Sequence, residues 1–225
     1  MPAAGSGSRA GLALPKQYAR LASRSVIEWS LQPFVDDPRC EGLMVALAPD
    51  DTHFAELDLK AAGTRLRRCE GGARRCDSVL AALQALPAAA TDWVLVHDAA
   101  RPCVSTAEVD ALLTQLGGHA IGGLLALPQS DTLKRDNGRG QVAGTVSREG
   151  LWRALTPQMF RVGALRDALT LALQGAVPPT DEAQALELAG LRPALVQGSP
   201  LNIKVTTGKD LALAEQILRS RREGA

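Results

Sequence analysis

The sequence is poor in aromatic residues and carries almost no net charge. Aromatic side chains make up 3% of its 225 residues, which argues against a surface that stacks nucleic-acid bases. The 25 basic and 24 acidic residues give a formal charge of +1, so no overall field attracts nucleic acid or a membrane surface. We therefore expect neither of these partners, and any anion must bind at a local cluster of cations.

The sequence also lacks a cysteine framework and a long apolar run. Its four cysteines show neither CxxC spacing nor a nearby histidine pair, which argues against a zinc site and against disulfides: Cys40, Cys69, Cys76 and Cys103. No apolar stretch approaches the ~20 residues of a membrane span, and Met1 to Gly5 do not begin a signal peptide. We expect a soluble cytoplasmic protein with reduced thiols.

Strand-like runs alternate with helix-like segments along the whole chain. The continuous apolar runs Leu43–Ala48 and Trp93–His97 are typical of buried parallel strands. Three segments carry apolar residues at helical spacing: 25–35, 75–86 and 106–116. Ser105 and Glu108 form a capping-box pattern before the third. The alternation predicts one α/β domain over residues 1–225, with a doubly wound, mostly parallel, Rossmann-like sheet.

One polar segment, at about residues 129–150, interrupts this alternation. It contains the turn dipeptide Asn137-Gly138 between alternating residues, so we predict a β-hairpin that projects from the domain. A polar hairpin of this length buries little by itself, which favours a dimerisation arm that embraces the second subunit of a homodimer. A surface loop is the alternative, and the residues alone do not decide between them.

The N-terminal segment is rich in small residues and ends in a cation, in the order Pro2-Ala3-Ala4-Gly5-Ser6-Gly7-Ser8-Arg9. Small residues let backbone N–H groups approach a polyphosphate, and Arg9 and the nearby Lys16 could clamp its oxygens. No GK[ST] follows the glycines, so this is not a Walker loop. A disordered terminus is the alternative for this segment taken alone.

Further polar residues lie where an α/β sheet binds ligands. The motif His97-Asp98-Ala99-Ala100-Arg101-Pro102 follows a predicted strand. Asp98 could hold a metal ion or a ribose hydroxyl and Arg101 a phosphate, while a local ion pair is the alternative. Lys204 lies in a strand-like run, residues 202–206, where a lysine needs an anionic partner such as a substrate phosphate. Thr180 heads a predicted helix, so capping is its alternative role.

Taken together and in order, these motifs resemble the 2-C-methyl-D-erythritol 4-phosphate cytidylyltransferases of the non-mevalonate isoprenoid pathway. The resemblance spans essentially the whole chain and is carried by PAAGxGxR, PKQY, DSV, HDAARP, LTPQ, TDEA and NIKVT. It implies transfer of a cytidylyl group from CTP to 2-C-methyl-D-erythritol 4-phosphate with release of pyrophosphate. It also implies a need for Mg²⁺ or another divalent cation.

The resemblance further assigns roles to residues of this sequence. It implies that CTP is bound by small residues of two segments: Pro2, Ala3, Ala4, Gly5, Gly7, Gly72 and Ser78. It implies catalytic charge neutralisation by Arg9, Lys16 and Lys204. It implies an acceptor site, with Asp98 also holding the metal, made of Asp98, Arg101, Thr132, Arg148, Thr156, Thr180 and Lys204. Of these, Thr132 and Arg148 are expected to reach the acceptor of the neighbouring subunit.

The chain departs from the family pattern at two places. Leu201 stands where the family usually has Asp, so Asn202 would have to serve in its place. The family has a hydrophobic strand before PAAG where this chain has only Met1, so we expect the central sheet to lack a strand. A ribitol 5-phosphate cytidylyltransferase shares the scaffold and is the nearest alternative. An inactive nucleotide-binding module is the other, although the retained Arg9 and Lys16 argue against it.

Overall fold

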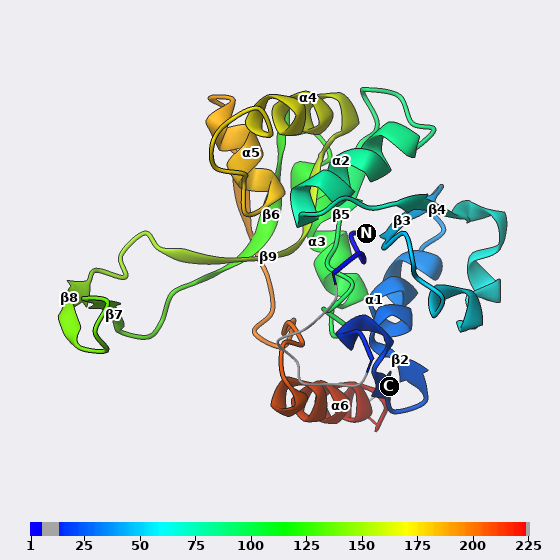
Figure 1. Ribbon diagram of the computed structural model, residues 1–225, viewed down its shortest axis with the longest axis horizontal. Coiled ribbons are helices and arrows are strands. Elements are labelled where there is room, and N and C mark those ends of the chain that lie inside the picture. The colour runs from blue at the N-terminus through cyan, green and yellow to red at the C-terminus, as the bar shows by residue number, and fades with distance from the viewer. Residues whose placement is uncertain (6–13, 224–225) are drawn as a thin grey trace.

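A computed structural model describes residues 1–5 and 14–223, and its helices and strands alternate along most of the chain (Figure 1). The α-helices are α1 (Val26–Val35), α2 (Arg75–Ala85), α3 (Thr106–Leu116), α4 (Val162–Ala172), α5 (Glu182–Leu188) and α6 (Gly208–Glu223). The strands are β1 (Arg20–Leu21), β2 (Arg24–Ser25), β3 (Leu43–Leu47), β4 (Leu66–Glu70), β5 (Trp93–Val96), β6 (Gly122–Pro128), β7 (Leu133–Asp136), β8 (Val142–Val146), β9 (Trp152–Arg161) and β10 (Ala194–Gln197). Short 3₁₀ helices span Lys16–Tyr18, Phe54–Glu56 and Lys60–Arg65.

The central strands form two separate groups, and helices pack against both of them. Four strands are ordered β10-β6-β9-β5, and β3 pairs with β4 separately. The β10–β6 and β3–β4 pairs are parallel, whereas β9 runs antiparallel to both β5 and β6. The predicted α/β fold is confirmed, and the sheet is mixed because β9 enters it on the return from the projecting hairpin.

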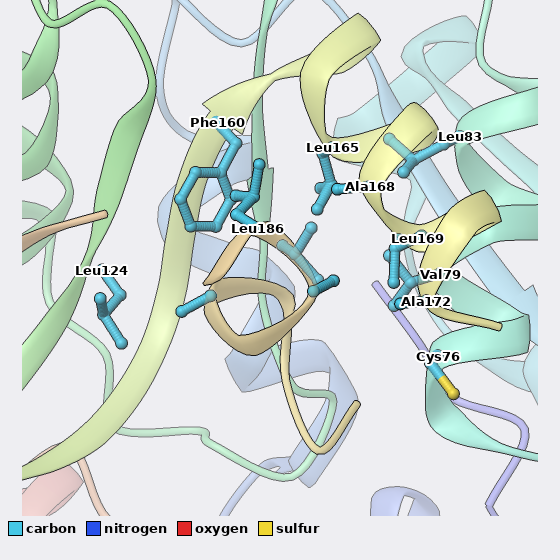
Figure 2. Close-up of a cluster of buried hydrophobic side chains, with 13 residues drawn as sticks. Cys76, Val79, Leu83, Leu124, Phe160, Leu165, Ala168, Leu169, Ala172 and Leu186 are labelled. Carbon is cyan, nitrogen blue, oxygen red and sulfur yellow. The ribbon is translucent and has the colours of Figure 1, made fainter. Parts of the chain in front are cut away.

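Capping and apolar periodicity explain where the helices lie. At the start of α3, the Ser105 hydroxyl accepts a hydrogen bond from the Glu108 backbone N–H, and the Glu108 carboxylate accepts one from Ser105 N–H, as the sequence predicts. The apolar face of α4 packs on β9, α2 and α5 (Figure 2). The fully buried Phe160, Leu165 and Leu186 lie in this cluster, and each such side chain contributes about 1.5–3 kcal/mol through burial.

A cavity of 680 Å³ separates the two groups of strands. Its lining includes residues of β3 and β5 together with α1, α2 and α3. Met1 to Ala3 lie along β3, where the Met1 ammonium donates to the carbonyl of Met44 (2.6 Å) and Pro2 bridges to Ala46. Burial lowers the pKa of the Met1 amine to about 6. The sheet is thus divided, and in the described residues no strand pairs with both β3 and β5.

The polar segment forms a hairpin that projects from the body of the molecule (Figure 1). Strands β7 and β8 pair with each other and, within the described residues, with no other strand. The turn is wider than the predicted two-residue turn, because Asn137 N–H donates to the Gln141 carbonyl and Gly138 and Gly140 both have positive φ. The predicted hairpin is therefore confirmed with a longer loop.

Candidate active site

The loops that follow β3, β4 and β5 converge beside the N-terminal segment. The glycine after β4, Gly71, donates its N–H to the Leu47 carbonyl (2.7 Å). A Cβ on Gly71 would lie 2.7 Å from the Cβ of Ala4 and 3.2 Å from the Leu47 oxygen, so a side chain there would push the two segments apart. The structure therefore brings together both groups of residues expected to bind CTP, one around Ala4 and one around Gly72.

Ser78 holds the Gly72 loop against the first turn of α2. Its buried hydroxyl accepts a hydrogen bond from Gly72 N–H (3.1 Å) and lies 3.2 Å from the Arg74 carbonyl, to which it can donate. Adding a Cβ to Gly72 would bring it 2.4 Å from the Cβ of Asp77. Ser78 thus shapes the loop from inside, while its expected contact with cytosine stays a prediction.

The described part of the N-terminal loop is anchored at two points. Ala3 N–H donates to the Ala46 carbonyl (2.8 Å). The buried Gln17 side chain donates to the carbonyls of Ala3 (2.8 Å) and Gly5 (3.1 Å). Lys16 begins the 3₁₀ helix beside them. Gly7 and Arg9, also expected at the phosphates, lie outside the described residues.

Asp98 is the centre of a cluster of charges after β5. Its Oδ2 lies 2.7 Å from Lys204 Nζ and 3.9 Å from Arg101 Nε, and its Oδ1 lies 2.9 Å from Arg75 Nε. Burial alone would raise the pKa of Asp98, but Arg75 and Lys204 hold it well below its usual range. Three predicted site residues, Asp98, Arg101 and Lys204, therefore meet, and the carboxylate is ionised at neutral pH.

The sequence did not identify Arg75, the third cation around Asp98, or Glu182, the second carboxylate that Arg75 contacts. The Arg75 guanidinium donates to both oxygens of Glu182, at 2.6 and 3.0 Å, and the Glu182 side chain is 0% exposed. Burial raises the pKa of Glu182, against the attraction of Arg75. The signal in the sequence was an acid in the TDEA motif that had received no role, and an arginine that opens the predicted helix at 75–86.

The backbone at Asp98 is fixed from inside the domain by two buried side chains. The Thr156 hydroxyl accepts from Asp98 N–H (3.1 Å) and donates to His97 Nδ1 (2.9 Å). The Nε2 of His97 donates to the Arg101 carbonyl (3.1 Å), which selects the Nε2–H tautomer. Burial lowers the pKa of His97 to about 3, so the ring is neutral. Thr156 therefore lies beside Asp98, but its hydroxyl is hydrogen-bonded to Asp98 and His97 of the protein itself.

The segment that carries Lys204 is not a strand, contrary to the sequence interpretation. Val205 N–H donates to the Ala100 carbonyl (2.8 Å), so the segment packs against the loop after β5 and is not paired with a strand. Its buried Asn202 donates from Nδ2 to Glu108 and to the Thr156 carbonyl, while its own carbonyl accepts from Arg101. Asn202 therefore organises the site, whereas the neighbouring Leu201 is exposed.

Thr180 lies one residue before the helix cap rather than on it. The N-cap of α5 is Asp181, whose carboxylate accepts from Gln184 N–H (2.9 Å). The exposed Thr180 hydroxyl donates to the Gln184 side chain. The capping role considered for Thr180 is thus wrong, and its expected contact with the acceptor substrate stays a prediction.

Thr132 directly precedes β7 and Arg148 follows β8, and both are exposed. They therefore belong to the arm, which projects from the body of the molecule (Figure 1). Arg148 donates to the Ser130 carbonyl at the base of the arm. The structure therefore does not bring these two residues to Asp98 within one chain.

Asp98 alone offers too few oxygens for a divalent cation, but Asp98 together with the phosphates of a bound substrate could hold one. The described residues hold no group of three or more His, Cys, Asp or Glu side chains placed to bind a metal. Mg²⁺ is commonly held by one or two carboxylates plus substrate phosphates. An ionised Asp98 beside a triphosphate would meet that requirement, so the donor set fits.

The arrangement places several cations beside the glycine-rich loops. Arg75, Arg101 and Lys204 surround Asp98, Arg75 also pairs with Glu182, and the charges of Arg153 and Glu108 both act on Arg101. Cations of this kind beside a glycine-rich loop are suited to bind phosphate groups.

The sequence matches one family model over residues 1–220, described as 2-C-methyl-D-erythritol 4-phosphate cytidylyltransferase. Proteins with that name from Pseudomonas paraeruginosa and Dechloromonas aromatica are 50% and 49% identical to the chain. The first match covers 94% of this chain and 91% of the relative, and the second covers 99% and 97%.

Solved structures agree with these matches. A 4-diphosphocytidyl-2C-methyl-D-erythritol synthase is 37% identical, with a TM-score of 0.83, and covers 96% of this chain and 95% of its own. A 2-C-methyl-D-erythritol 4-phosphate cytidylyltransferase from Francisella tularensis is 35% identical, with a TM-score of 0.79 and 96% coverage of both chains. In the described residues, no helix is long and apolar enough to cross a membrane.

Proposed function

The chain belongs to the family of 2-C-methyl-D-erythritol 4-phosphate cytidylyltransferases, and on that basis we propose how its residues divide the work of the reaction. The enzyme transfers a cytidylyl group from CTP to 2-C-methyl-D-erythritol 4-phosphate and releases pyrophosphate. The observation that carries the assignment of the site is the Asp98 cluster, with Lys204 at 2.7 Å and Arg75 at 2.9 Å, beside the Ala4 and Gly72 loops.

In the proposed reaction, an oxygen of the acceptor phosphate attacks the α-phosphorus of CTP. A new P–O bond forms as the bond to the β-phosphate oxygen breaks, and pyrophosphate leaves with that electron pair. The attacking phosphate is already an anion, so no general base is required. The state of His97 is consistent with this, because the ring is buried and neutral and both of its nitrogens are hydrogen-bonded within the protein.

Catalysis then rests on positioning and on neutralisation of negative charge. We assign Lys16 and Arg9 to the triphosphate, with the backbone N–H groups of Ala4 and Gly5 supporting its oxygens, since Pro2 has no N–H and the Ala3 N–H donates to the Ala46 carbonyl. Arg101 and Lys204 would hold the acceptor phosphate in line. The exposure of Lys204 supports this assignment, because 39% of its side chain is accessible and can therefore reach a ligand.

Asp98 would hold Mg²⁺ together with phosphate oxygens of CTP. When bound, the ion offsets charge on the triphosphate and on the leaving pyrophosphate. The protein's own part is to keep the carboxylate ionised and oriented. The charges of Arg75 and Lys204 support this role, because their attraction outweighs the effect of burial and holds the pKa of Asp98 well below the ordinary value.

We also propose that two chains form a homodimer through the β7–β8 arm. The exposed Thr132 and Arg148 would contribute to the acceptor site of the partner, since they flank the strands of the arm, which projects from the body of their own chain. The four cysteines are free thiols, which supports a reducing cytoplasmic location.

A substrate comparison tests this function. Pyrophosphate release would be measured with CTP and either 2-C-methyl-D-erythritol 4-phosphate or ribitol 5-phosphate, at equal Mg²⁺. We expect turnover with the first acceptor and little with the second. Faster turnover with ribitol 5-phosphate would reassign the acceptor, and no turnover with either would remove the assignment of the site.

A further inference from the structure

Arg75 and Arg74 are consecutive arginines with different surroundings. Arg74 is the N-cap residue of α2, its side chain is 46% exposed, and it pairs with Asp77 in the first turn of the helix (2.7 Å). Arg75 is 26% exposed and uses all three guanidinium nitrogens on carboxylates far away in the sequence. Arg74 therefore serves its own helix, whereas Arg75 connects separate parts of the fold.

The connection made by Arg75 joins the Asp98 loop to helix α5. Its Nε donates to Asp98 Oδ1 at 2.9 Å, and its Nη1 and Nη2 donate to the two oxygens of Glu182. Glu182 is fully buried in the first turn of α5. The buried carboxylate holds the guanidinium through two hydrogen bonds, and the guanidinium in turn holds Oδ1 of Asp98.

The planar guanidinium can hold two carboxylates at once, which a lysine ammonium does with less defined geometry. The other oxygen of Asp98, Oδ2, lies on the side of Lys204 and Arg101. Arg75 therefore occupies one oxygen of Asp98, Oδ1, and leaves Oδ2 to the side of Lys204, whose partly exposed ammonium a ligand can reach.

We propose that Arg75 is a positioning residue for cytidylyl transfer, which acts through Asp98 and is itself anchored by Glu182. This inference rests on the proposed role of Asp98 at the metal and the substrates. Residues that orient a ligating carboxylate typically change metal affinity or activity by about 10–100-fold when they are replaced.

The test compares Arg75→Lys with Arg74→Lys, which changes the exposed neighbour in the same way. For R75K we expect kcat to fall at least ~10-fold. The Mn²⁺ concentration that half-saturates the protein–CTP complex, measured by electron paramagnetic resonance, should rise by a similar factor. R74K should keep both values within about twofold of the wild-type protein. Wild-type kcat and Mn²⁺ affinity in R75K would overturn the proposal.

A second variant separates positioning from stability. Replacing the pair together, as Arg75→Met with Glu182→Leu, removes the buried charge and is often neutral for stability. We expect this double variant to melt within a few degrees of the wild type and to keep the kcat defect. Recovery of kcat together with the melting temperature would show that Arg75 is only structural. Asp98→Asn is the reference: if that variant is fully active the role of Asp98 fails, whereas an inactive D98N beside an active R75K removes only the role of Arg75.

Discussion

The Nζ atom of Lys204 lies 2.7 Å from Oδ2 of Asp98, although 106 positions separate the two residues in the sequence. The contact links the loop after β5 to the segment before α6. Lys204 is the most exposed of the three cations around Asp98, and in the proposed reaction it exchanges Asp98 for the substrate phosphate.

Replacing Lys204 with alanine should therefore affect the acceptor more than the nucleotide. Loss of one hydrogen bond to a charged group corresponds to a KM for the acceptor phosphate raised by about 10–100-fold. The KM for CTP should change less than about threefold. Lys209→Ala, an exposed lysine at the start of α6, is the matched control and should resemble the wild type. Steady-state kinetics with each substrate varied in turn would check this, and an unchanged acceptor KM would contradict it.

Lys16 should act on the chemical step. If it neutralises charge that develops during transfer, Lys16→Ala should lower kcat by roughly a hundredfold or more, as the loss of one transition-state donor does. The KM for CTP should move much less. Lys60→Ala in the 3₁₀ helix Lys60–Arg65 is a surface control. An unchanged kcat with a large rise in KM would make Lys16 a residue that only binds CTP.

The cross-subunit role of the arm can be tested by mixing two variants that are each impaired at a low, fixed concentration of the acceptor phosphate. Arg148→Ala damages the arm, and Lys204→Ala damages the core site. If the arm of one chain completes the site of the other, a mixed dimer has one intact site, and activity should return when the two proteins are unfolded and refolded together. Mixing either variant with itself is the control. No gain of activity in a confirmed mixed dimer would place each arm at its own site.

Stability should depend on pH through His97. Its pKa is lowered to about 3 in the folded protein, against ~6.5 when unfolded. Between these values the unfolded chain binds more protons, so stability is fully present above pH ~6.5 and is lost as pH falls. The loss from this group should reach ~2 kcal/mol at pH 5. Urea unfolding at pH 7 and pH 5 would measure it. The pH dependence should be smaller by that amount in His97→Asn, and an equal dependence in both proteins would refute the assignment.

Local signals in the sequence predicted most of the elements and part of the site. The Ser105–Glu108 capping box and the apolar run at β5 depend on neighbouring residues, so they can be read directly. Asp98 was predicted because it follows a strand. The Arg75–Glu182 pair spans 107 positions and depends on how α2 and α5 pack, which no local pattern reports.

The errors have the same origin. Lys204 was expected in a strand because it lies in an apolar, strand-like run, but the Val205 N–H donates to the Ala100 carbonyl in a loop instead of to a neighbouring strand. The cap of α5 was displaced by one residue, because Thr180 and Asp181 are both good caps and only the fold selects Asp181. Gly7 and Arg9 remain predictions, since they lie outside the described residues.

If Asp98 organises cytidylyl transfer, removing its charge should slow the chemical step itself. Pyrophosphate release by Asp98→Asn would be followed in a single turnover at saturating CTP, Mg²⁺ and 2-C-methyl-D-erythritol 4-phosphate, well below the melting temperature. Asparagine keeps the shape but removes the charge that Lys204 and Arg75 contact. We expect a rate at least ~100-fold below the wild type. A rate within a few-fold of the wild type would show that Asp98 does not organise the transfer.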